Sequence, residues 1–174
     1  MTTSEERAWR GLDVLRILIG AIWAANLLFI ALPAAQYWST FSDVAAGYGP
    51  TSLGGPGFAN YVSAHPLFFS WFIAIATAYL AIAFLVGFTT RLACAVGFVA
   101  SLAFFLTQWN TTFAFPGGTD VGAHPLYLAI YVALFVGGAG RFWSVDAWIW
   151  RSGHARLAGP ARWIATPAPL APPP

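Results

Sequence analysis

Residues 66–88, PLFFSWFIAIATAYLAIAFLVGF, form a run of 23 residues without a charged side chain. A helix of about 20 apolar residues is long enough to cross the hydrocarbon core of a bilayer. The run starts with Pro66, which a helix tolerates at its first position because the missing N–H would have no partner there. This stretch therefore predicts a membrane-spanning helix, and the rest of the chain can be interpreted around it.

Three further apolar runs predict three more spans, so that the spans cover about residues 14–33, 66–88, 92–109 and 125–143. Hydrophobic residues make up 59% of the chain and charged residues 8%, whereas a soluble domain carries about a quarter charged residues. The sequence thus predicts an all-α, polytopic membrane protein. A four-transmembrane-helix bundle occupies residues 1–150, and residues 151–174 form a tail rich in proline and alanine.

The eight arginines predict the orientation of the spans, because positively charged residues collect in cytoplasmic loops. They lie before the first run, between the second and third runs, and after the fourth: Arg7, Arg10, Arg16, Arg91, Arg141, Arg151, Arg156 and Arg162. Both termini are therefore expected in the cytoplasm, with the protein in a bacterial plasma (inner) membrane. The arginines are scattered singly and there is no lysine, which argues against nucleic acid as a partner.

The connecting segments contain weaker signals. Residues 34–65 are predicted to form a short interfacial helix followed by irregular chain, because an amphipathic stretch gives way to GYGPTSLGGPG. After the last run, Ser144 is expected to cap a short interfacial helix. Three glycines are expected to weaken the end of the fourth run.

Small residues at every fourth position predict helix contact faces: Gly20 and Ala24; Ala74 and Ala78; Ala93, Gly97 and Ser101.

Candidate chemistry lies at the opposite, outer face. The matching segments AHPLF and AHPLY place His65 and His124 before the second and fourth runs, and Gln108, Trp109 and Asn110 end the third. Imidazole, amide and aromatic groups at one level of a membrane would suit a quinone headgroup. The same residues would also serve as helix caps and as an interfacial aromatic belt. The imidazoles could also ligate a metal or haem, although haem in a membrane bundle usually needs histidines that face one another from within helices. No metal site is predicted, and motifs that need paired cysteines are absent because Cys94 is the only cysteine.

Three segments resemble the DoxX/DoxD family of small four-helix membrane proteins. GFTTRLA at residues 87–93 is similar to the family signature G-[LF]-x-T-R-[LA]-A. GAGRFWSVD at residues 138–146 is similar to the family ending G-x-G-R-[FYW]-S-[LIV]-D, with one extra aromatic residue. Arg16 and Gly20 fit its opening R-x-x-x-G. Many members carry a lysine late in the first span and a glutamate early in the second, and both regions are uncharged here: Phe29 to Leu32 and Ile75 to Tyr79.

The resemblance implies one of two functions. The DoxD branch is associated with thiosulfate:quinone oxidoreduction, and other members are described as accessory subunits of membrane redox assemblies. Without the charged pair, we expect an accessory or structural subunit of a larger membrane complex, with no activity on its own and with lipids and other membrane subunits as partners. The alternative is a quinone-reactive oxidoreductase subunit with an outer-face quinone site, quinone being the cofactor considered.

The charged residues on the cytoplasmic side have two interpretations. Arg16, Arg91 and Arg141, together with Asp146, are expected either to anchor helix ends at the interface or to bind an anionic lipid headgroup. Asp13 or Asp146 is expected to pair with Arg91 or Arg141.

Overall fold

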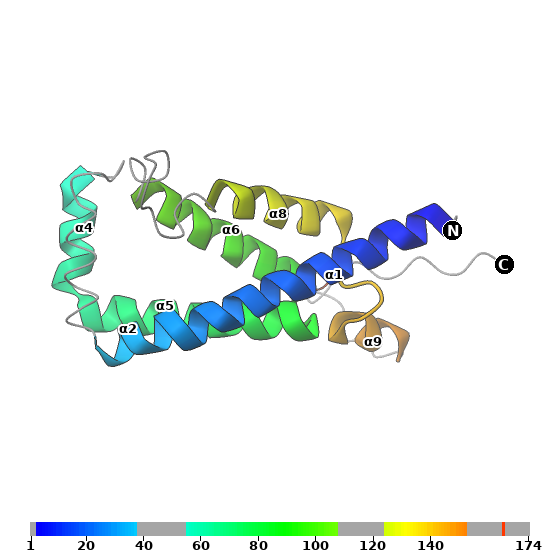
Figure 1. Ribbon diagram of the computed structural model, residues 1–174, viewed down its shortest axis with the longest axis horizontal. Helices are drawn as coiled ribbons and strands as arrows, with labels where there is room; N and C mark the ends of the chain where they lie inside the picture. The colour runs from blue at the N-terminus through cyan, green and yellow to red at the C-terminus, as the bar shows by residue number, and fades with distance from the viewer. Residues whose placement is uncertain (1–2, 38–54, 108–123, 153–164, 166–174) are drawn as a thin grey trace.

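The computed structural model describes residues 3–37, 55–107, 124–152 and 165, and within these ranges the regular structure is entirely helical (Figure 1). This confirms the all-α prediction for the described part of the chain. The helices are α1 (Thr3–Asn26), η1 (Leu27–Ala31), α2 (Leu32–Gln36), α4 (Gly55–Ala64), α5 (Pro66–Val86), α6 (Thr90–Thr107), α8 (His124–Gly137) and α9 (Val145–Arg151).

In the part of the chain that the structure describes, two stretches are long and apolar enough to cross a membrane: Ser4–Gln36, which joins α1, η1 and α2, and Pro66–Val86, which is α5. Thr90–Phe105 in α6 and His124–Gly137, which is α8, are also apolar but shorter. Length and composition thus distinguish two membrane-length helices from two shorter ones.

The first helix changes pitch near its end because of Pro33. A proline has no N–H and its ring collides with the carbonyl four residues earlier, so it disturbs an α-helix. The π-helical turn η1 lies just before it, and Leu32 N–H bonds the carbonyl of Leu27. This turn lets the chain continue as a helix to Gln36 instead of ending at the proline.

The four longest helices run alternately up and down, with α1 packed mainly on α5 and α6 mainly on α8 (Figure 1). At one end of the bundle, α4 crosses the helix ends, and at the other lies α9. These are called the α4 end and the α9 end below. α5 and α6 are joined by a tight turn at the α9 end, but they contact each other less extensively than either contacts its main partner.

Two glycines from the predicted small-residue faces lie at the main helix contacts. A Cβ atom at Gly20 would lie 2.7 Å from the backbone nitrogen of Leu85, so α1 and α5 meet too closely for a side chain there. A Cβ at Gly97 would lie 2.8 Å from the ring of Tyr131, where α6 meets α8. The small-residue prediction is therefore confirmed at both positions.

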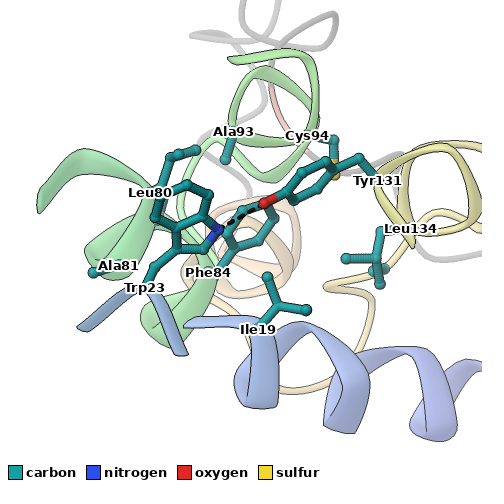
Figure 2. Packing of buried hydrophobic residues seen from close by; sticks show 11 residues of the cluster. Ile19, Trp23, Leu80, Ala81, Phe84, Ala93, Cys94, Tyr131 and Leu134 are labelled. Atoms are coloured by element: carbon teal, nitrogen blue, oxygen red, sulfur yellow. Dashed lines mark hydrogen bonds between the residues drawn. The ribbon is translucent and has the colours of Figure 1, made fainter. Parts of the chain in front are cut away.

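All four long helices contribute to the apolar core (Figure 2). Trp23 of α1 donates a hydrogen bond of 2.7 Å from Nε1 to the hydroxyl of Tyr131 on α8. The Tyr131 ring also stacks on Phe84 of α5, with ring centroids 5.8 Å apart. Figure 2 shows these rings beside Ala93 and Cys94 of α6. A polar link between buried aromatic rings thus joins the two helix pairs.

Three boundaries differ from the predictions. α1 begins at Thr3, well before the predicted start of the first span at about residue 14. α4 begins at Gly55, inside the stretch expected to be irregular, because Pro56 falls in a first turn, where proline is tolerated. α8 ends at Gly137, six residues before the predicted end at residue 143. It ends there because Gly138 has φ +67° and Ala139 N–H bonds the Leu134 carbonyl, a glycine-terminated helix end.

Candidate functional site

Three charged residues are buried at the α9 end of the bundle. Asp13 and Arg16 of α1 have 0% exposure, and Asp146 in the first turn of α9 has 1%. Burying a charge is costly unless it is paired and hydrogen-bonded, so the partners of these groups define what the site does. These residues, with the backbone groups that they bind, are called the polar cluster.

Asp13 holds the segment that follows α8. One of its carboxylate oxygens accepts hydrogen bonds from the backbone N–H groups of Phe142, at 3.0 Å, and Trp143, at 3.1 Å. The other oxygen accepts from Gly140 N–H. A single carboxylate thereby satisfies three backbone donors of a non-helical segment and ties that segment to α1.

Arg16 binds the end of α5. One Nη donates to the carbonyls of Phe84 and, at 3.3 Å, Leu85, which belong to the last helical turn and have no helical partner. The other Nη donates to the Trp143 carbonyl at 2.5 Å, and Nε lies 3.9 Å from the Asp13 carboxylate. A cation at a helix C-terminus also interacts favourably with the helix dipole.

Asp146 caps the start of α6. Its two oxygens accept from the N–H groups of Thr89, at 2.8 Å, and Thr90, at 2.9 Å, and its own N–H donates to the Gly87 carbonyl at 3.0 Å. α9 carries this carboxylate and is itself capped as predicted, because Ser144 Oγ accepts from Ala147 N–H at 2.9 Å.

The turn between α5 and α6 is backbone-strained at one position. Thr89 has φ +53°, a value that β-branched residues rarely adopt. Its hydroxyl donates to the Phe88 carbonyl at 2.7 Å and lies 2.9 Å from the Tyr79 hydroxyl, so Tyr79 is the donor in that pair. Together with the Asp146 carboxylate, these bonds hold the strained turn in place.

The polar cluster therefore joins the three segments on which the family resemblance rests. Arg16 belongs to the first, the Gly87–Thr90 turn to the second and the Gly140–Asp146 stretch to the third. Because their polar groups bind one another's backbone, the chemistry available to this site is the fixing of helix ends. Arg16 and Asp146 act as anchors in this arrangement, and both are buried away from the surface.

Arg91 and Arg141 lie beside the polar cluster but are only partly buried. The guanidinium of Arg91 lies 5.4 Å from the Phe135 ring centroid, and that of Arg141 lies 4.3 Å from the Trp9 ring centroid. The sequence predicts that Asp13 or Asp146 pairs with Arg91 or Arg141. In the structure, the ion-pair partner of Asp13 is Arg16 instead.

The residues of the predicted outer site are only partly described. His65 is exposed at the start of α5, 4.7 Å from the Tyr61 ring, whereas His124 is half-buried at the start of α8 and stacks on Phe104 at 5.5 Å. The two histidines lie in different helix pairs, each with its own aromatic neighbour. Gln108, Trp109 and Asn110 lie outside the described residues.

The site also shows what the sequence signals missed. The sequence predicts Asp13 as a partner for Arg91 or Arg141, although its spacing of three residues from Arg16 places both charges on one face of α1. Two charges on one face, just before a long apolar run, were the available signal for a buried pair. Within the described ranges, no group of three His, Cys, Asp or Glu residues could hold a metal ion.

Comparison of the chain with protein-family models, curated proteins and solved structures finds no match.

Proposed function

We propose that this chain is a DoxX-like, four-span protein of the bacterial plasma membrane that serves as an accessory subunit of a larger, redox-linked membrane complex. The observation that carries the proposal is the distribution of polarity: the buried charges bind backbone at one end of the bundle, while large apolar side chains cover its sides. Such a molecule is built to hold its own shape and to present an apolar surface.

The apolar surface extends over all four long helices. Among its most exposed side chains are Phe29 after α1 (79%), Ile75 on α5 (66%), Val99 on α6 (65%) and Val136 on α8 (78%). Soluble monomers rarely expose extended apolar patches of this kind. Lipid tails, or the spans of partner subunits, would cover these side chains in a membrane.

The shorter helices are compatible with four spans. α8 has 14 residues and rises about 21 Å, less than the typical 30 Å hydrocarbon core. The buried residues Gly138, Ala139 and Gly140 continue the chain beyond α8 within the protein. A short span is accommodated by local thinning of the bilayer or by association with other helices, and the latter fits an accessory subunit.

Affinity purification of the full chain in digitonin, followed by mass spectrometry and a visible absorption spectrum, tests this function. Larger membrane proteins should co-purify in fixed proportion and be absent when the untagged chain is expressed. Ile75→Trp on α5 and Val136→Trp on α8 add the same bulk to two different faces. Loss of partners with one variant but not the other would locate the interface, and purification of the chain without partners would contradict the proposal.

Single-cysteine labelling tests the orientation. In a Cys94→Ala background, Ser4→Cys and Ser152→Cys place thiols near the two ends of the described chain, and Ala64→Cys places one at the α4 end. All three original side chains are exposed. In intact cells, a membrane-impermeant maleimide should label only the cysteine at residue 64. Labelling of either of the other two cysteines would contradict the proposed topology.

The quinone-reactive alternative is supported by one observation, the half-buried imidazole of His124 against Phe104 and 6.3 Å from the Tyr127 ring. An imidazole that stacks on an apolar ring, with a phenolic ring tilted beside it, would suit contact with an amphipathic headgroup. His124→Ala should then slow quinone reduction by membranes that contain the complex. His65→Ala is the matched comparison, and unchanged kinetics in both variants would exclude a quinone site at these histidines.

A further inference from the structure

Two arginines, Arg91 and Arg141, flank the last turn of α8. Arg91, in the first turn of α6, lies over Phe135, and Arg141 donates from Nε to the Gly138 carbonyl at 3.2 Å while lying over Trp9. No carboxylate among the described residues lies within ion-pair distance of either guanidinium.

Both guanidiniums lie against the end of α8. Arg91 lies over the Phe135 ring, and Arg141 bonds the carbonyl of Gly138, three positions further along the chain. Asp13 accepts hydrogen bonds from three backbone N–H groups and lies beside Arg16, and Asp146 accepts from the N–H groups of Thr89 and Thr90. Little of the charge of either carboxylate is therefore available to compensate Arg91 and Arg141. An arrangement that holds two partly buried cations near one another is stabilised by an anion that binds both.

We propose that Arg91 and Arg141 together bind a phosphate group, supplied either by the headgroup of an anionic phospholipid or by free phosphate. A guanidinium has a planar edge of N–H donors that matches two phosphate oxygens. Phe135 and Trp9 hold the two guanidiniums against aromatic rings, and the Gly138 carbonyl accepts from the Nε of Arg141, not from its Nη groups. The site lies at the α9 end, which the proposed topology assigns to the cytoplasmic interface. Binding of a lipid headgroup therefore rests on the proposed function, whereas binding of free phosphate does not.

Binding to the purified full chain tests the site. The protein is held in an uncharged detergent and titrated separately with dioctanoyl phosphatidylglycerol, dioctanoyl phosphatidylcholine and inorganic phosphate, and bound ligand is counted by native mass spectrometry. Arg91→Gln and Arg141→Gln each remove one charge. Arg7→Gln is the matched control, because it removes the same charge from an exposed position on α1.

Each of the two site variants should weaken phosphatidylglycerol binding about tenfold, as expected for the loss of charge-assisted hydrogen bonds, and the control should leave it unchanged. Arg91→Lys keeps the charge but loses the planar edge, and it should weaken binding several-fold in a protein that folds normally. This variant keeps the test valid if a glutamine variant is unstable.

The ligands distinguish the two sources. Binding of phosphatidylglycerol without binding of phosphate identifies a lipid site, and binding of both identifies a site for the phosphate group alone. Equal binding of phosphatidylglycerol and phosphatidylcholine without phosphate binding would overturn the inference, as would equal losses in the control and the site variants. None of these outcomes depends on finding a partner subunit, so this inference and the proposed function can fail separately.

Discussion

Replacement of Asp13 by asparagine changes one buried side chain without changing its size. The carboxylate accepts three backbone hydrogen bonds, two at the oxygen that faces Phe142 and Trp143 and one at the oxygen that faces Gly140. An asparagine can place its carbonyl toward the first two donors, but its amide group then points at the third. The Gly140 N–H would lose its acceptor, and the remaining two bonds would lose their charge.

The expected loss of stability follows from these bonds. A buried donor left unsatisfied costs about 1–3 kcal/mol, and each of two charge-assisted bonds that becomes neutral costs about 0.5–1 kcal/mol. Arg16 also loses its ion-pair partner at 3.9 Å. The lower desolvation cost of an amide offsets part of this loss, so Asp13→Asn should reduce the free energy of unfolding by about 2–4 kcal/mol.

Titration of the protein from mild detergent into SDS measures this change, with helix content followed by circular dichroism. Glu6→Gln is the control, because Glu6 is a partly exposed carboxylate on the same helix that pairs with Arg10 at 2.5 Å, and its loss should cost less than about 1 kcal/mol. Hydrogen exchange should accelerate at Gly140, Phe142 and Trp143 in the Asp13 variant. Equal, small losses in both variants, with no faster exchange, would refute the role assigned to the polar cluster.

Three other substitutions test separate contacts by the same unfolding titration. Gly20→Ala should lower the free energy of unfolding by about 1–3 kcal/mol, because the added methyl group collides with the α5 backbone. Gly11→Ala is the control: a Cβ there has nothing within 4 Å, so this variant should be neutral or slightly more stable. Similar effects of the two substitutions would contradict the close helix contact. Tyr131→Phe removes the acceptor for Trp23 and should cost about 1–2 kcal/mol, with a change in tryptophan emission; unchanged emission and stability would show that this bond contributes nothing. Asp146→Asn should also lower the free energy of unfolding by about 1–2 kcal/mol and should accelerate amide exchange only in the first turn of α6. Faster exchange throughout the bundle would argue against a local cap.

The helices were predictable because their signals are local. An uncharged run of 23 residues needs no tertiary information to be identified as a helix, and α5 follows the prediction to within two residues. Ser144 likewise predicted the start of α9, because a capping hydroxyl binds an N–H within its own helix. Gly20 and Gly97 were predictable as contact positions, although the sequence did not specify which helix each would meet.

The polar cluster was not predictable in detail, because its bonds connect residues far apart in the chain. Asp13 meets Phe142 across 129 positions, and Asp146 meets Thr89 across 57. The sequence suggested that these acids would pair with arginine side chains, the usual partners of a carboxylate at a surface. Burial changes that choice, since unpaired backbone N–H groups at helix ends also require acceptors and a carboxylate can satisfy several of them.

The position of the polar cluster bears on whether α8 can serve as a span. Non-helical backbone is tolerated at membrane depth only where it is buried in protein, because lipid offers no hydrogen bonds. α8 ends at Gly137, and the segment that follows has N–H groups at Gly140, Phe142 and Trp143 that all bind Asp13. These groups would be costly within a bilayer without that carboxylate. In the proposed four-span topology, Asp13 supplies the acceptors for the backbone that leads from the end of α8 to the cytoplasmic interface, so Asp13→Asn should impair insertion of the last span more than it impairs the other three.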